Sequence, residues 1–163
     1  MVVLGGTLAA VPISVAGAST HKAHKNVKAK THSLKPGTVP ACSKISAITI
    51  NAALGTHVTS ATGKAGTGTL KHVETCTYAG GAGVSIYYDA GISLQTFQEA
   101  LSSLSGSAAV KGVGKSAYSS QSSNTDPNQY QVAALFGSLE IAITADASVA
   151  NESALLKTID SKI

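Results

Sequence analysis

The sequence lacks tryptophan and arginine, and among 163 residues it has only five tyrosines, two phenylalanines and two cysteines. Nucleic-acid recognition relies on arginine and on aromatic rings that stack on bases, so we predict no nucleic-acid partner. A chain so poor in aromatic residues must build its core from small aliphatic side chains. Because Cys42 and Cys76 are the only cysteines, a disulfide formed in an oxidising compartment must join these two residues.

Motifs of catalysis and cofactor binding are also missing. No serine stands in a Gly-x-Ser-x-Gly elbow. The spacing of Gly112 and Gly114 fits neither the dinucleotide fingerprint nor a Walker A sequence. We therefore predict that the protein is not an enzyme and binds no cofactor and no metal ion.

The first 18 residues have the pattern of a secretory signal peptide. Val2–Ala18 is an uncharged run that ends in Ala16-Gly17-Ala18, the small-x-small pattern that precedes a signal-peptidase cut. A membrane anchor is the alternative, but the run is interrupted by Pro12 and falls short of about 20 apolar residues. We expect a protein that is secreted or lies on the extracellular face of the cell envelope.

Residues 19–40 form a basic segment without a single acidic residue. Few apolar side chains and a block of like charge predict a disordered linker. Such a segment can attach the protein to an anionic cell-wall polymer or a membrane surface, and a solvated spacer is the simpler alternative. The lysines that would make this contact are Lys22, Lys25, Lys28, Lys30 and Lys35.

Residues 41–163 are long enough for one small domain, which opens with a helix and a hairpin. Ser46 and Gly55 bracket a predicted helix over 47–54 as its N-terminal and C-terminal caps. A strand is expected over 57–62 and a glycine-rich loop over 63–68. The stretch 69–89 then predicts two strands around a glycine turn, because apolar and polar residues alternate after the turn.

The second half of the domain repeats this order. A helix is predicted from Ser93 to Gly106, because apolar residues recur at helical spacing between them. Three strands are expected next, over 110–118, 130–136 and 139–144, with a polar loop at 119–128 and a type II′ turn at Gly137-Ser138. Leu155, Ile159 and Ile163 recur every four residues and predict a terminal amphipathic helix.

This order of elements predicts an α+β fold in which helices pack on the faces of an antiparallel sheet. Two sets of side chains are candidates for function. His72 and Glu74 have the same parity on a predicted strand, and with His57 and Asp89 they form a possible polar cluster. Tyr87, Tyr118 and Tyr130 are possible aromatic contacts for a ligand, and packing at the sheet edges is their alternative role.

Several short motifs resemble secreted actinobacterial proteins of the family called domain of unknown function 3558. These motifs are Cys42-Ser43, Ile45-Ser46, Leu54-Gly55, Cys76-Thr77-Tyr78 and Val110-x-Gly-Val-Gly114 with Ala117. The resemblance implies a PsbP-like α/β/α sandwich, a Cys42–Cys76 bond and a location in the cell envelope, but it implies no activity. The chain departs from the family in having no lipobox cysteine and in carrying Lys115 where an acidic residue is usual.

Together these patterns predict a secreted or envelope-associated, non-catalytic binding or sensor-like module. A structural wall-associated protein held by its basic segment is one alternative. A hydrolase that uses His72 and Glu74 is the other.

Overall fold

The computed structural model describes residues 39–80, 83–122 and 129–163, all of which belong to one compact unit, Thr31–Ile163. The predicted signal peptide and nearly all of the predicted linker, including its five lysines, lie outside the described residues. Val39 packs against the core and Pro40 is buried, so the folded domain includes two residues that the sequence assigned to the linker.

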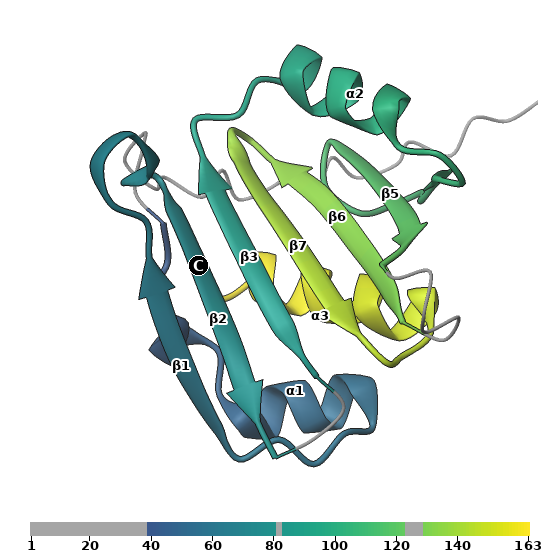
Figure 1. Ribbon diagram of the computed structural model, residues 1–163. Coiled ribbons are helices and arrows are strands. Elements are labelled where there is room, and N and C mark those ends of the chain that lie inside the picture. Colours follow the sequence, from purple (N-terminus) through teal and green to yellow (C-terminus); the bar gives the residue numbers. More distant parts are fainter. Residues whose placement is uncertain (1–38, 81–82, 123–128) are drawn as a thin grey trace, which may run out of the picture. The chain divides into compact units, whose positions relative to one another are not determined.

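A seven-stranded antiparallel sheet forms the centre of the domain (Figure 1). The strand order is β1-β2-β3-β7-β6-β5-β4, so β3 and β7 join two hairpin-connected halves. The strands are β1 (Ser60–Ala65), β2 (Val73–Ala79), β3 (Ser85–Ala90), β4 (Ala108–Ala109), β5 (Ser116–Gln121), β6 (Tyr130–Phe136) and β7 (Leu139–Ala145).

Helices cover both faces of this sheet, which confirms the predicted α+β class. Helices α1 (Ala47–Leu54) and α3 (Val149–Asp160) contact each other and pack on one face. Helix α2 (Leu94–Ser103) packs on the opposite face over β5, β6 and β7. Of two short 3-10 turns, η1 (Cys42–Lys44) precedes α1 and η2 (Gly68–Leu70) lies between β1 and β2. None of the helices described is both long and apolar enough to cross a membrane.

Local sequence explains where the helices begin. A serine precedes each α-helix, and its hydroxyl accepts a hydrogen bond from a backbone N–H in the first turn. Ser46 accepts from Thr49 N at 3.3 Å and Ser93 accepts from Thr96 N at 3.0 Å. The predicted start of α1 and its end at Gly55, which has a φ of 70°, are both confirmed.

Two separate cores follow from the alternation of side chains along the strands. The main core lies between the sheet and α1 and α3, and its fully buried residues include Ile86, Ile141 and Leu155. The second core is smaller and lies under α2, where the rings of Phe97 and Tyr118 have centroids 5.4 Å apart. The main core is largely aliphatic, as the composition predicted, but Tyr78 and Tyr88 are buried in it, and the second core is centred on an aromatic pair.

The predicted strand over 110–118 is correct only at its end, because β5 begins at Ser116. Residues 110–115 are instead the connection between β4 and β5, which reverses direction so that Val110 N donates to Ala117 O. Gly112 and Gly114 have φ values of 74° and 54°, which residues with a side chain rarely adopt. A Cβ at Gly114 would lie 2.6 Å from Leu135 O, so this turn also needs glycine for close backbone packing.

The first strand is displaced from its predicted position. It spans 60–65 rather than 57–62, and so it takes up part of the predicted loop at 63–68. Strand β5 likewise extends into the predicted loop at 119–128, of which residues 123–128 lie outside the described part. At the β6–β7 turn, Gly137 has a φ of 65° and Ser138 does not have a positive φ, which is the pattern of the predicted type II′ turn.

Candidate functional site

A disulfide between Cys42 and Cys76 ties η1 to β2, as the sequence predicted. Both residues are buried, with Cα atoms 5.5 Å apart. Gly63 lies opposite Cys76 on the neighbouring strand, and a Cβ there would come within 2.9 Å of Cys42 Sγ. Glycine inside β1 therefore makes room for the crosslink, which explains why this strand contains a residue of low strand propensity.

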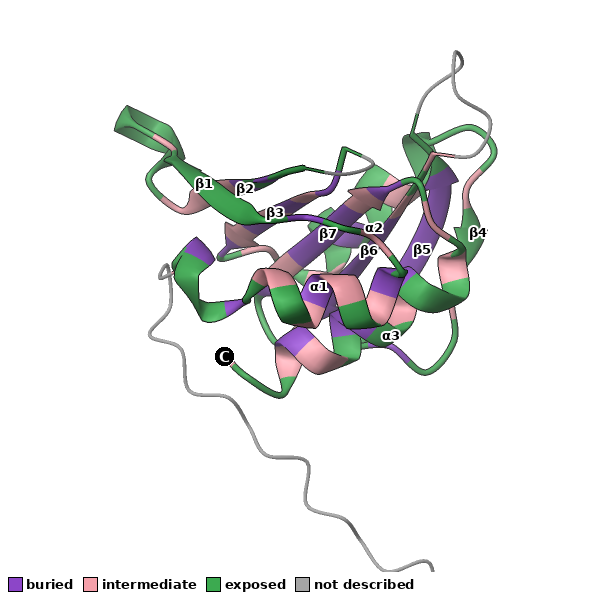
Figure 2. Ribbon diagram, turned by 90° about the horizontal axis from the view of Figure 1, so that it is seen from below, coloured by how far each residue is buried: buried purple, intermediate pink, exposed green. Residues whose placement is uncertain are grey.

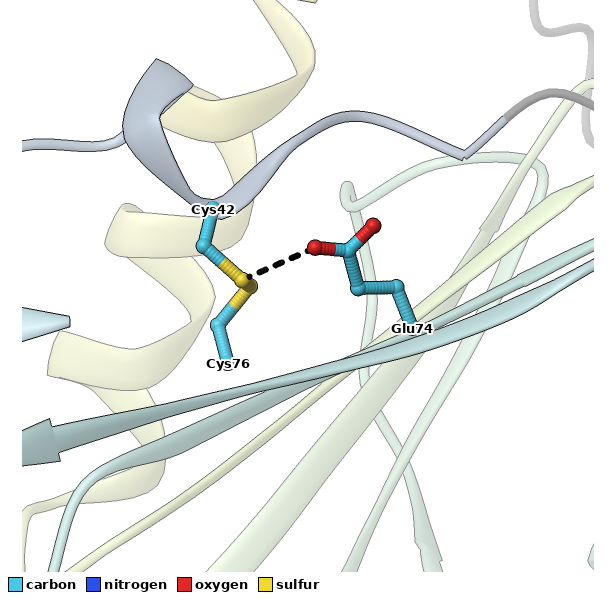
Figure 3. Close-up of side chains that lie close together, drawn as sticks. All are labelled: Cys42, Glu74 and Cys76. Atoms are coloured by element: carbon cyan, nitrogen blue, oxygen red, sulfur yellow. Dashed lines mark hydrogen bonds between the residues drawn. A yellow bond between two sulfur atoms is a disulfide. The ribbon is translucent and has the colours of Figure 1, made fainter. Parts of the chain in front are cut away.

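The Glu74 carboxylate lies against this disulfide (Figure 3), with Oε1 3.2 Å from Cys42 Sγ. A disulfide sulfur carries no proton, so the contact is a close sulfur–oxygen approach and not a hydrogen bond. Cys42, Glu74 and Cys76 place potential metal ligands within 4.8 Å of one another. Metal coordination by cysteine requires thiolates, and both sulfurs here are committed to the disulfide bond.

The opposite face of the sheet carries a second polar group of residues. Asp89 lies between two partners: His72 Nε2 is 3.5 Å from its Oδ1, and Tyr87 donates its hydroxyl proton to Oδ2 at 3.1 Å. Tyr87 and Asp89 point to the α2 side because they alternate with Tyr88, which is fully buried in the main core. Asp89 is largely buried, with 13% of its side chain exposed.

Glu140 adds a second carboxyl group to this place, because it lies directly opposite Asp89 in the β3–β7 pair. Burial, followed by the charge of Asp89, raises the pKa of Glu140 above its ordinary value. Burial and then the same carboxylate raise the pKa of the Tyr87 hydroxyl to about 12. We refer to His72, Tyr87, Asp89 and Glu140 as the acidic cluster; it favours protons and cations over anions.

The four-residue polar cluster predicted from the sequence does not assemble. His72 and Asp89 do meet, but Glu74 lies against the disulfide on the other face of the sheet. His57 is exposed and lies beside Gly80, beyond the other end of β2. The reason is that His72 precedes β2, so strand parity does not control the direction of its side chain. The arrangement of His72 and Glu74 required by the hydrolase alternative is therefore not present.

The predicted tyrosine contacts differ in availability. Tyr118 is only 5% exposed and packs on Phe97, so its predicted role as a ligand contact is wrong and its alternative role in packing is correct. Tyr87 is half-buried beside the acidic cluster. Tyr130 is 36% exposed at the start of β6.

A continuous polar surface lies beside α2, where β1, β2 and β3 turn the same face outward. The second core under α2 takes its sheet residues from β5, β6 and β7, apart from Tyr87 at its margin. Strand pairing aligns the hydroxyl side chains of β1, β2 and β3, together with Thr144 near the end of β7, in rows on this face. We call this surface the hydroxyl face; its residues are Thr62, Lys64, Thr75, Thr77, Ser85, Tyr87 and Thr144.

Sequence reasoning missed the hydroxyl face and the pairing of Asp89 with Glu140. The alternation of Thr75 and Thr77 with Cys76 was a usable signal for one row of the face. The neighbouring rows depend on the order of strands in the sheet, which the periodicity of a single strand does not give.

One further ionisable group lies in the main core. Glu152 on α3 is fully buried; its Oε2 accepts a hydrogen bond from Val132 N at 3.1 Å, and its Oε1 has no hydrogen-bond partner in the described structure. Burial raises the pKa of this carboxyl to about 8, and the Val132 hydrogen bond opposes that shift. The group is therefore mainly protonated at neutral pH, which suits a core that offers it no cation.

Comparison with known proteins adds no match to these observations: no protein-family model, no curated protein and no solved structure matches the chain. What can be said about function therefore comes from the residues and their arrangement.

Proposed function

We propose that the domain is an extracellular, non-catalytic module that binds a glycan on the hydroxyl face. The observation that carries this proposal is the row of hydroxyl side chains on a sheet surface that α2 leaves uncovered. An antiparallel sheet normally has a polar outer face on which charged residues are common. Among the β1, β2 and β3 residues on this face, Lys64 is the one charge outside the acidic cluster.

The chemistry of this face fits a neutral, polyhydroxylated polymer. Threonine and serine hydroxyls both donate and accept hydrogen bonds, as sugar hydroxyls do. Adjacent strands lie about 4.8 Å apart, so Thr62, Thr77 and Ser85 form a row of repeating contacts across β1, β2 and β3. Tyr87 adds an aromatic ring beside that row.

The acidic cluster lies at one end of the hydroxyl face and restricts which ligands this face can bind. Asp89 and Glu140 repel an anionic polymer from the end of the face near His72. We therefore propose that the face selects neutral or amine-bearing glycans. Attachment to anionic wall polymers or to a membrane surface is the proposed role of the basic segment at 19–40, whose five lysines carry the opposite charge.

The proposed location rests on two observations. The apolar run ending at Ala18 has a signal-peptide pattern, and the single pair of cysteines forms a disulfide. The resemblance of the sequence to the secreted family also supports this proposed location, and it adds an association with the cell envelope. The PsbP-like fold that the resemblance implies is part of the same proposal.

Replacing hydroxyl groups without changing side-chain shape tests the proposal. In the double variant Thr75→Val/Thr77→Val, two hydrogen bonds to the glycan are lost, so we expect binding to peptidoglycan stripped of anionic polymers to weaken about tenfold. Thr158→Val on α3 is the matched control, because its hydroxyl is bonded within the helix and lies on the other side of the domain. Co-sedimentation gives the affinities, and equal binding by the double variant and the wild type would overturn the proposal.

The basic segment is tested separately. Replacing its five lysines by alanine should reduce retention on intact, anionic walls at low salt to the level that the hydroxyl face alone provides, and should leave binding to stripped peptidoglycan unchanged. The wild type should also lose wall retention as salt rises, because exposed charges are screened within about 10 Å at 0.1 M. If wall retention depends on neither the lysines nor the salt concentration, the basic segment has no part in the proposed function.

A further inference from the structure

The two edges of the sheet differ in length and protection. At one edge, β4 contains only Ala108 and Ala109, and a short edge strand offers little backbone for pairing. At the other edge, β1 has six residues that pair with β2 without a bulge, and all six are exposed. Figure 2 shows this strand in green at the rim of the domain.

The direction of the free backbone groups follows from the hydrogen-bond pattern. Gly66 N donates to O of Val73, its partner in register, and bonded pairs alternate along an antiparallel ladder. The even-numbered residues of β1 therefore bond to β2. The residues whose N–H and C=O groups point outward from the sheet are Ala61, Gly63 and Ala65.

The side chains of β1 do not shield these groups. The strand has no proline, no acidic residue and no large apolar side chain, and Lys64 is its one charged residue. Natural proteins usually protect an edge of this length by a bulge, a proline or several charges. The six residues of β1 have none of these features except Lys64.

We propose that β1 pairs antiparallel with β1 of a second copy of this chain, in a register centred on Gly63. Two identical edge strands that join their sheets through a two-fold axis perpendicular to the sheet run antiparallel. Because the outward groups belong to odd-numbered residues, odd residues must pair with odd residues. The register centred on Gly63 pairs Ala61 with Ala65 and Thr62 with Lys64 of the other copy.

The charge on β1 disfavours one of the two neighbouring registers, the one centred on Lys64. A shift that pairs Lys64 with the same lysine of the second copy places like charges directly opposite each other, which is unfavourable. In the register centred on Gly63, each lysine instead faces a threonine hydroxyl. A glycine at the centre also lets the two backbones approach without opposing side chains.

The resulting dimer has a continuous sheet of fourteen strands, twice the seven of one copy. Its two-fold axis is perpendicular to the sheet, so the hydroxyl faces of both copies lie on the same side. The inference does not depend on the proposed glycan binding, because it rests on the backbone groups of β1. If both hold, one polymer chain can contact two hydroxyl faces and gains avidity.

Sedimentation velocity of the full chain tests the pairing over concentrations from about 1 μM to about 1 mM. We expect a concentration-dependent monomer–dimer equilibrium. Thr62→Lys should weaken the dimer about fivefold, because two new lysine–lysine contacts form per dimer, and Thr62→Glu should strengthen it by a similar factor at low salt.

Matched controls separate this register from other contacts. Ser60→Lys and Ser60→Glu place the same charges on the same face of β1 but do not oppose Lys64 in the register centred on Gly63, so both should have much smaller effects than the Thr62 variants. Ala61→Pro removes an outward N–H that β2 does not use and should abolish the dimer. A monomeric wild type at the highest concentration overturns the proposal, as does a dimer that these Thr62 and Ala61 variants leave unchanged.

Discussion

The two faces of the sheet are made by the same strands, yet they have opposite characters. The face toward α1 and α3 carries the disulfide and is apolar and buried over its centre, with Glu74 and the exposed strand β1 at one edge. The face toward α2 is apolar only under the helix and is polar over β1–β3. Strand β2 shows both characters within five residues, because Cys76 and Tyr78 are buried on one side while Thr75 and Thr77 face the other. The buried core therefore lies mainly on one face of the sheet, and the binding that we propose would use the other.

The largest expected effect is on the buried face. Replacing Cys42 and Cys76 by alanine removes a crosslink that spans 34 residues, and the chain-entropy model predicts a loss of about 3 to 4 kcal/mol in the free energy of unfolding. Urea denaturation of the variant and the wild type measures this loss. A loss below about 1 kcal/mol would mean that the buried face is stable without its crosslink.

A substitution in the second core should reduce the free energy of unfolding by a smaller amount, because this core is smaller. Phe97→Ala removes the only fully buried ring under α2, and we expect a loss of about 3 kcal/mol, near the lower end for such substitutions. Leu94 and Leu101 are partly exposed and can move into the space. Urea denaturation monitored by tyrosine fluorescence measures it, and a loss greater than that of the disulfide variant would reverse the ranking of the two faces.

A pH effect is expected from the buried face. The pKa of Glu152 is raised to about 8 in the folded protein, from 4.5, so the unfolded chain releases this proton first as pH rises. Its contribution to stability is present below pH 4.5 and is lost as pH rises through 8, at up to about 1.4 kcal/mol per pH unit. Glu152→Gln should remove this slope, as measured by urea denaturation at several pH values. An unchanged slope contradicts the assignment.

The smallest expected effect is a gain on the polar face. Glu140→Gln removes one of two carboxyl groups that oppose each other across β3 and β7, so we expect stability at pH 7 to rise by up to about 1 kcal/mol. Glu99→Gln on the exposed surface of α2 is the control and should have little effect. Thermal unfolding compares the two variants. A loss of stability in Glu140→Gln would show that the cluster stabilises the fold.

Much of the fold could be predicted from the sequence, because its signals lie within a few residues of one another. Ser46 and Gly55 define α1 locally, and Gly137 defines the β6–β7 turn. The connection at 110–115 was read as a strand because two glycines in a short apolar stretch fit either a bulged strand or a turn. The backbone of Leu135, which is distant in sequence, packs against Gly114 and leaves room only for glycine.

The candidate sites were less predictable for a related reason. Asp89 and Glu140 are distant in sequence and meet only because β3 pairs with β7. Glu74 was assigned to the side of His72 by strand parity, but β2 begins at Val73 and parity does not apply before it. Local patterns predicted which residues are polar, and long-range pairing decided which of them meet.

The position of the disulfide also has a mechanical consequence. Cys42 lies three residues after Val39, where the described structure begins, and its partner is in the middle of β2. A pulling force applied through the basic segment would pass from Cys42 across the sulfur–sulfur bond directly into the sheet. The residues between Cys42 and Cys76, which include α1 and β1, lie in a covalent loop outside that path. If the segment holds the protein to a wall under tension, these elements would stay folded while the force is carried by β2.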